Sequence, residues 1–170
     1  MNKNLKNVLI LFFICLFVGF LLAFINQQTA PIIENSKIEG VKDSLTAALP
    51  NASGDEFEII EDVDTPPTIT GIYRHLKSGD FAVTIETASS YSKSNMLLTV
   101  GVTADGKIEN IVVVNYAETR DVGEDFFKSF IGKDSTLSGV NTVSGVTYSS
   151  SAIKSVVSDV FAALSTFLEK

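Results

Sequence analysis

The sequence predicts an α+β fold, an antiparallel sheet packed with helices, preceded by one N-terminal transmembrane helix. Three observations predict it. An unbroken apolar run lies near the N-terminus, the middle of the chain alternates apolar and polar residues between turns that contain glycine, and the C-terminus carries apolar residues at helical spacing.

The first element is a predicted membrane anchor. Residues 8–25 are apolar apart from Gly19 and Cys15. Eighteen helical residues rise about 27 Å, which is close to the hydrocarbon thickness of about 30 Å. A cleaved signal peptide is the competing interpretation. We favour a retained anchor over residues 1–30, with the span at about 8–25, because Pro31 lies where a cut after Ala30 would fall.

Charge predicts the orientation of this anchor. Lys3 and Lys6 precede the span, and the first charge after it is Glu34, so the positive-inside rule leaves the N-terminus in the cytoplasm. We therefore expect a single-pass protein of the cell membrane with residues 26–170 exported. That part carries 11 Lys+Arg and 20 Asp+Glu, a net charge of −9, which disfavours nucleic acid as a partner. Cys15, the only cysteine, falls inside the span, so the exported part has no disulfide and no cysteine ligand for a metal.

Residues 31–50 are expected to form a linker and then a helix, because Ile38, Val41, Leu45 and Leu49 recur at helical spacing before Pro50. Residues 51–170 would then form the exported domain. It opens on an acidic stretch, 55–64, which lacks the spacing of a calcium loop and is interpreted as a solvated loop. A short strand is predicted at 57–60.

Two hairpins are predicted in the middle of the chain. Strands at 69–76 and 81–88 flank Lys-Ser-Gly-Asp, and strands at 96–103 and 107–117 flank Ala-Asp-Gly. The last strand has an apolar centre, Ile-Val-Val-Val, and is expected to be a central strand covered on both faces. Between them, 88–95 is rich in serine and is interpreted as a loop.

Two helices follow. A short one carries Phe126, Phe127 and Phe130 on one side and stops at Gly132. A long one is expected to begin near 149–151. Its apolar stripe comprises Ile153, Val156, Val157, Val160, Phe161, Leu164 and Leu168.

Few side chains suggest conventional catalysis. His75, the only histidine, is interpreted as a surface residue of a hairpin strand, and without a second histidine or a cysteine a transition-metal site is not expected. No phosphate-binding glycine loop, zinc-protease motif or nucleophile elbow occurs. We assign no catalytic residue and no metal ligand.

The segment Ser144-Gly145-Val146-Thr147-Tyr148-Ser149-Ser150 is the main candidate for chemistry. Gly145 permits a positive φ and close backbone approach. Hydroxyl side chains before a long helix either cap its free N–H groups or help those groups to bind a phosphate. The residues alone leave both interpretations open.

This segment resembles the flavinylation motif of the FMN-binding domain family, roughly Asp-x-x-Ser-Gly-Ala-Thr followed by hydroxyl residues and a helix. The likeness continues upstream, where 100–133 resembles the family's paired strands, its Glu-Thr-Pro-Gly-Leu-Gly-type loop and its Phe-rich helix. The family includes subunits of the Rnf-type electron transport complex and of the sodium-translocating NADH:quinone reductase, which carry an N-terminal span and an exported domain.

The resemblance implies that FMN is joined covalently to Thr147 through a phosphoester, by a separate flavin transferase. It also implies that the chain is an electron-transfer subunit rather than a self-contained enzyme, with other membrane subunits of an electron transport complex as partners. The cofactor-binding residues that it implies are Thr147, Ser144, Gly145, Val146, Ser149, Ser150, Glu118, Thr119 and Gly123.

The sequence departs from the family pattern at three places. Asn141 stands where the motif has Asp, Val146 stands where it has Ala, and Arg120-Asp121 replaces the Pro-Gly of the upstream loop. Two alternatives therefore stay open: a stand-alone exported FMN carrier, and a flavin-free structural or binding subunit that has lost attachment. A type IV pilin is disfavoured because no glycine-ended processing site precedes an early glutamate.

Overall fold

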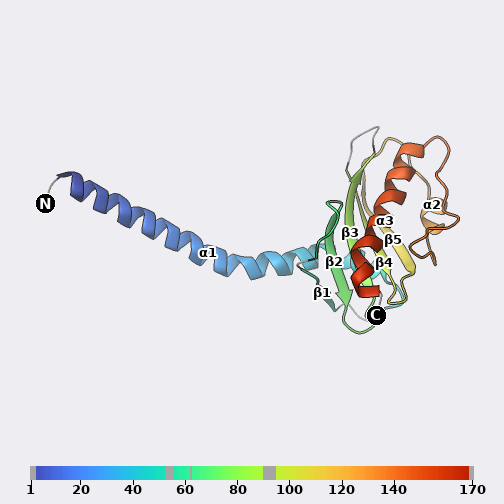
Figure 1. Ribbon diagram of the computed structural model, residues 1–170, viewed down its shortest axis with the longest axis horizontal. Coiled ribbons are helices and arrows are strands. Elements are labelled where there is room, and N and C mark those ends of the chain that lie inside the picture. The colour runs from blue at the N-terminus through green and yellow to red at the C-terminus, as the bar shows by residue number, and fades with distance from the viewer. Residues whose placement is uncertain (1–2, 53–55, 62, 90–94, 169–170) are drawn as a thin grey trace. The chain divides into compact units, whose positions relative to one another are not determined.

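The structure is a computed structural model that describes residues 3–52, 56–61, 63–89 and 95–168, without the side chains of 3–6 and 25–40. It divides into two compact units, Met1–Gly40 and Val41–Lys170 (Figure 1). The boundary falls within a helix rather than in a loop.

The first unit is helical throughout its described length. It belongs to helix α1, Lys3–Ala48, whose last turns are part of the second unit. Within α1, Asn7–Phe24 is apolar and long enough to be a membrane span or a signal sequence. The linker expected before residue 38 is not seen, since α1 continues through Pro31. A proline removes only one hydrogen bond of the helical ladder, and helix on both sides of it can compensate for that loss.

The second unit is built on a five-stranded antiparallel sheet. Its described strands are β1 (Phe57–Ile59), β2 (Ile69–His75), β3 (Phe81–Ala88), β4 (Asn95–Val102) and β5 (Ile108–Tyr116). Their order in the sheet is their order in the chain, so every pairing joins consecutive strands (Figure 1). Both predicted hairpin turns are present, with positive φ values of 77° at Gly79 and 74° at Gly106.

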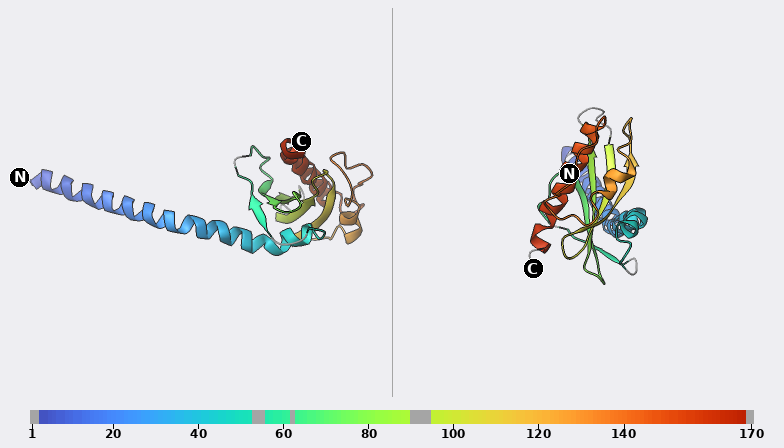
Figure 2. Two further views of the ribbon diagram at one scale, coloured as in Figure 1. Left: turned by 90° about the horizontal axis from the view of Figure 1, so that it is seen from below. Right: turned by 90° about the vertical axis from the view of Figure 1, so that its right-hand side faces the viewer.

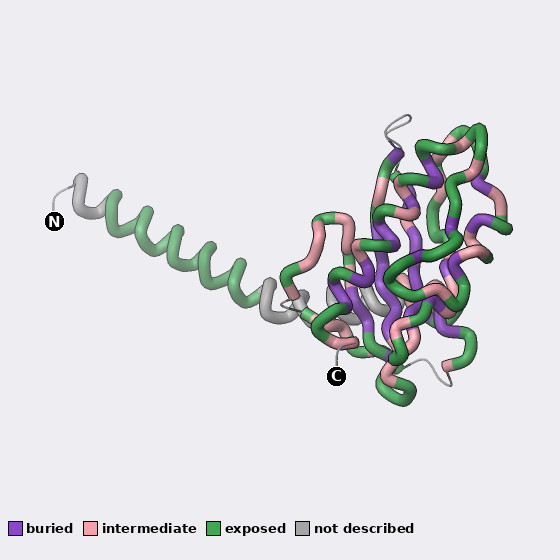
Figure 3. The backbone as a smooth tube through the Cα atoms, turned by 45° about the vertical axis from the view of Figure 1, so that its right-hand side comes forward, coloured by how far each residue is buried: buried purple, intermediate pink, exposed green. Residues whose placement is uncertain are grey.

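The prediction that the last strand is central is wrong. β5 lies at an edge of the sheet, and Val113 and Val114 near its end are exposed. The strands buried on both faces are β3 and β4, in which residues 81–85 and 98–102 are all buried (Figure 3). An apolar run does not by itself distinguish a central strand from an edge strand that is partly covered by a loop.

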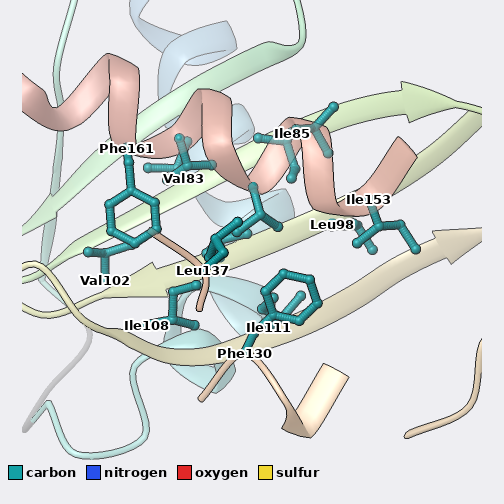
Figure 4. Packing of buried hydrophobic residues seen from close by; sticks show 14 of the residues in the cluster. Val83, Ile85, Leu98, Val102, Ile108, Ile111, Phe130, Leu137, Ile153 and Phe161 are labelled. Atoms are coloured by element: carbon teal, nitrogen blue, oxygen red, sulfur yellow. The ribbon is translucent and has the colours of Figure 1, made fainter. Parts of the chain in front are cut away.

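The two faces of the sheet are packed differently. One face carries large side chains, such as Ile85 and Leu98, against helix α3, Thr147–Leu168 (Figure 4). On the opposite face, β3 and β4 carry small residues, such as the paired Ala82 and Gly101. There, Gly101 lies so close to the end of α1 that a Cβ atom on it would be 2.0 Å from the Ala48 carbonyl oxygen. Figure 2 shows α3 and the end of α1 on opposite sides of the sheet.

The predicted apolar stripe of α3 is confirmed. Ile153, Val156, Val157, Val160, Phe161 and Leu164 are buried, and Leu168 is partly buried against the same core. α3 is also apolar and long enough to cross a membrane, but its buried stripe makes it the core helix of the second unit. The short helix α2 spans Glu124–Lys128 and contributes Phe126 to the core, where it meets Phe130 edge to face at 5.1 Å between ring centroids.

His75 is buried, which contradicts its interpretation as a surface residue. Its side chain is 0% exposed. The imidazole Nδ1 accepts a hydrogen bond from the Ser78 backbone N–H at 3.2 Å and lies 2.8 Å from the Ser78 hydroxyl. Phe57 packs edge to face on the ring at 5.3 Å. A strand residue next to a tight turn can thus be buried by that turn and by the neighbouring strand, which the pattern of β2 alone did not indicate.

Candidate functional site

The end of the sheet at which β5 finishes carries a pocket of about 450 Å³. One wall is the loop after β5, and the other is the loop and first turn that begin α3. Its lining residues are Glu118, Thr119, Arg120, Gly145, Val146, Thr147, Tyr148 and Ser149. The pocket therefore joins the two segments that the sequence analysis singled out, although they are about 30 residues apart in the chain.

Thr147 is the first residue of α3, two positions before the predicted start. Its side chain is exposed, and its hydroxyl lies 3.4 Å from the Val143 carbonyl oxygen. The N–H groups of a first helical turn have no carbonyl partner within the helix and carry a partial positive charge. An anion joined to the Thr147 oxygen would lie beside those groups and be stabilised by them.

Gly145 gives the loop its shape. Its φ is +84°, a conformation that side chains rarely adopt, and no atom lies within 4 Å of the position that a Cβ would occupy. Space is therefore open above the backbone next to Thr147. Val146, in contrast, is partly buried and packs against the hydrophobic core, so its side chain holds the loop to the core while Gly145 lets the backbone turn.

The base of the pocket is a polar network. The buried Ser149 hydroxyl donates to the Glu118 carboxylate at 3.1 Å, which connects α3 to the opposite wall. The Tyr116 hydroxyl donates to the Arg120 carbonyl at 2.8 Å and so holds the shape of that wall. Burial raises the pKa of the Tyr116 hydroxyl; Ser149 opposes this by hydrogen bonding, and the Glu118 and Asp121 charges add to it.

Ser150 lies behind the pocket rather than in its lining. Its side chain is 0% exposed. Its hydroxyl accepts from the Val143 N–H at 3.1 Å and donates to the Val146 carbonyl at 3.0 Å. Ser150 therefore fastens the 143–146 loop to the first turn of α3, and it positions Thr147 without facing the pocket.

Six of the nine predicted cofactor-binding residues line the pocket: Glu118, Thr119, Gly145, Val146, Thr147 and Ser149. The other three do not. Ser150 is buried, Ser144 is exposed outside the lining, and Gly123, with a φ of +84°, is the N-cap residue directly before α2. For all nine residues, the assignment to cofactor binding stays a prediction.

Two lining residues were missed. Arg120 follows the predicted Glu118-Thr119 pair directly, and Tyr148 follows Thr147. The signal available for both residues was that each directly follows a predicted site residue. The family resemblance indicated Arg120 only as a departure from its pattern, and it did not indicate Tyr148 as a cofactor-binding residue.

The residues present fit a flavin mononucleotide. The pocket volume lies within the roughly 300–1,000 Å³ typical of small-molecule sites. It offers an exposed hydroxyl at a helix N-terminus for a phosphate, an aromatic side chain at Tyr148 for a flat ring, and open space beside Gly145. Among the described residues, no group of three or more His, Asp, Glu or Cys side chains could hold a metal ion.

Comparison with known proteins agrees with this fit. No curated protein matches the chain. The family model of the FMN-binding domain matches residues 92–162. This segment contains both walls of the pocket, the edge strand β5 and most of α3. The match supports the FMN-binding domain family for the part of the chain that builds the pocket.

Proposed function

We propose that this chain is a membrane-anchored flavoprotein that carries FMN covalently on Thr147 and relays electrons within an Rnf-type membrane electron transport complex, as a flavin-bearing subunit of that complex. The observation that carries the proposal is the placement of Thr147. Thr147 lies in the first turn of α3, and its exposed side chain lines the pocket. The segment that builds this pocket matches the FMN-binding domain.

The chain's own residues would bind and orient the flavin. The first turn of α3 would hold the phosphate, and Ser149 would keep the Glu118 carboxylate in the opposite wall through their 3.1 Å hydrogen bond. Tyr148 would cover the ring on its exposed side. FMN itself supplies reversible electron transfer. The membrane anchor would keep the site close to membrane partners.

Attachment would need a separate flavin transferase. A threonine hydroxyl is a weak nucleophile unless a base activates it, and His75, the only histidine in the sequence, is buried beside the β2–β3 turn. In the reaction, the Thr147 oxygen bonds to the flavin's phosphorus in FAD and the P–O–P bond breaks. AMP leaves, and a base on the transferase takes the hydroxyl proton.

Intact mass of the purified full-length chain, co-expressed with a flavin transferase, tests the proposal. We expect a mass gain of one FMN less one water, and a flavin signal (yellow colour, with fluorescence under ultraviolet light) that persists after denaturation. Thr147→Ala should remove both, whereas the nearby Thr142→Ala should keep both. A bare polypeptide mass despite an active transferase, or attachment that survives Thr147→Ala, would contradict the proposal.

A flavin-free subunit is the second candidate, and Asn141 and Val146 are the observations that favour it. Asn141 is exposed, so a transferase could contact it, and Val146 packs on the core, so its two additional methyl groups hold the loop in place. Asn141→Asp with Val146→Ala should raise flavin occupancy if these departures block attachment. A stand-alone exported carrier would show the same occupancy as the complex subunit, and co-purification of membrane subunits separates the two.

A further inference from the structure

Three exposed hydrophobic side chains of the second unit lie in or next to the segments that form the pocket. In its described part, the large hydrophobic side chains that are exposed are those of Leu76, Val113, Val114, Ile131 and Tyr148. Tyr148 lines the pocket and is 64% exposed. Val113 and Val114, which are 39% and 46% exposed, lie on the end of β5 that leads into the pocket loop. We call these three residues the valine–tyrosine surface.

The pairing of β4 with β5 is irregular at the two valines. Leu97 of β4 pairs with Asn115, and Leu98 pairs with Val113, so Val114 has no residue opposite it. Such a β-bulge bends a strand and re-aims its side chains, and bulges are common at sheet edges and beside functional sites. Val114 and Glu118 are four positions apart in the chain, which limits the distance between them to about 13 Å at 3.3 Å per residue. The valines therefore lie near the pocket mouth.

The surroundings of this surface are acidic. Residues 41–170 carry 10 Lys+Arg and 18 Asp+Glu, a net charge of −8. In the 118–128 segment, four carboxylates face two cations, and one of those cations, Lys128, already pairs with Glu124 at 3.0 Å. Asp121 and Asp125 are exposed in the same segment. An apolar centre with an acidic rim complements a partner with an apolar centre and a basic rim.

We propose that the valine–tyrosine surface docks an electron-transfer protein with a positively charged surface, which exchanges electrons with a flavin held in the adjacent pocket. This inference rests on the proposed function, because electron exchange with a docked partner requires a flavin in the pocket. Each encounter moves one electron from the flavin to one oxidised centre of the partner. Two ferric haems thus accept the two electrons of a fully reduced flavin, and the flavin's protons go to water.

A second copy of this chain fits the surface less well. A symmetric dimer would bring each acidic rim against its own equivalent, and like charges would oppose the contact. A basic partner gains from the same charges. Its contact would resemble the small, short-lived interfaces of redox pairs, which bury less than about 1,200 Å². Charge then raises the association rate, and the effect falls with salt.

Oxidised cytochrome c, a basic haem protein, is a suitable probe. The FMN-loaded full-length chain is reduced in detergent, and haem reduction is followed by stopped flow at several salt concentrations. Val113→Ser with Val114→Ser should lower the second-order rate about tenfold through loss of the apolar contact. Asp121→Asn with Asp125→Asn should lower it about threefold at low salt and flatten its salt dependence. Circular dichroism and the retained flavin mass confirm that each variant is folded.

Matched controls lie at the other end of the sheet. Leu76→Ser removes an exposed apolar side chain, and Asp105→Asn removes an exposed charge from the β4–β5 turn. Both should leave the rate unchanged. Equal losses in controls and docking variants would overturn the inference. So would a rate that is insensitive to salt, or a dimer seen by sedimentation that Val113→Ser with Val114→Ser dissociates.

A titration without flavin separates the two proposals. Thr147→Ala keeps the valines, Tyr148 and the acidic rim, and it should bind cytochrome c at low salt as tightly as the unmodified chain does. If the native chain carries no flavin but this binding is present and is lost with the two valines, the proposed function fails and the docking surface stands. If the flavin is present but no binding is measured, the docking inference alone is overturned.

Discussion

The two ends of the sheet differ in how far their polar groups are engaged in hydrogen bonds within the protein. At one end, which we call the closed end, the turns hydrogen-bond to each other and the end of α1 hydrogen-bonds to β5. The Ala104 N–H donates to the Asp80 carboxylate at 2.8 Å, and the Asn110 side chain donates to the Ala47 carbonyl at 2.8 Å. At the pocket end, the Thr147 hydroxyl and Tyr148 are exposed beside open space. The contrast indicates that stability is concentrated at one end and binding capacity at the other.

Gly101→Val should have the largest effect on stability because it acts at the closed end. Its Cβ would overlap the Ala48 carbonyl, so the end of α1 would have to move away from the sheet. We expect a loss of about 3 kcal/mol in the free energy of unfolding, measured by urea titration of the detergent-solubilised chain. Ala162→Val, on the exposed side of α3, is the control. A change below about 0.5 kcal/mol, as at an ordinary surface position, would show that the contact is loose.

His75→Ala should have the next largest effect. It leaves a cavity under Phe57 and removes the acceptor of the Ser78 N–H. The combined loss should be about 2–3 kcal/mol, seen as a lower midpoint of thermal unfolding. Leu76→Ala, one residue further along and exposed, should change little. Equal effects of the two substitutions would mean that the closed end does not depend on the buried ring.

Ser149→Ala tests the pocket end and should cost less. It removes one hydrogen bond to Glu118, worth about 0.5–1.5 kcal/mol. Its main consequence should be local. With the two walls no longer joined, amide hydrogen exchange should rise in residues 117–120 and stay unchanged in the β4–β5 turn. Exchange that rises at both ends would show that the two ends are not independent.

Tyr116→Phe should have the smallest effect, which is measured as a change in the pH dependence of stability at alkaline pH. The folded state holds the Tyr116 proton more tightly than the unfolded state, because burial raises its pKa above 10.0. Its contribution is therefore complete below the unfolded pKa and is lost as pH rises through the folded value. The variant should lose less stability than the native chain between neutral and strongly alkaline pH. Tyr73, whose pKa burial also raises, remains in both proteins and cancels in the difference.

The sequence predicted the strands well and their environment less well. Alternation and the turns at Gly79 and Gly106 located β2 to β5 to within one or two residues. These signals are local, so the chain around each strand is enough to produce them. The edge position of β5, the burial of His75 and the contact between Gly101 and Ala48 depend on segments distant in the chain. No local pattern reports such contacts.

The candidate site divides in the same way. The residue types of the 144–150 segment, with the family resemblance, indicated Thr147 and Gly145 as a phosphate position. Glu118, which the resemblance also indicated, lies in the same pocket, whereas Ser150 faces inward. Helix periodicity placed the start of α3 two residues late, because a threonine in the first turn contributes nothing to an apolar stripe.

The order of the strands has a consequence for how the chain reaches this structure. Since each strand pairs only with its neighbours in sequence, every hairpin can form as soon as its second strand has been synthesised, and no early strand waits for a distant partner. Pairing between sequence neighbours keeps the contact order within the sheet low, which favours rapid formation of the sheet. Helix α3 follows the five described strands in the chain and completes their hydrophobic core, so the threonine at its start is fixed in place only after those strands have been made.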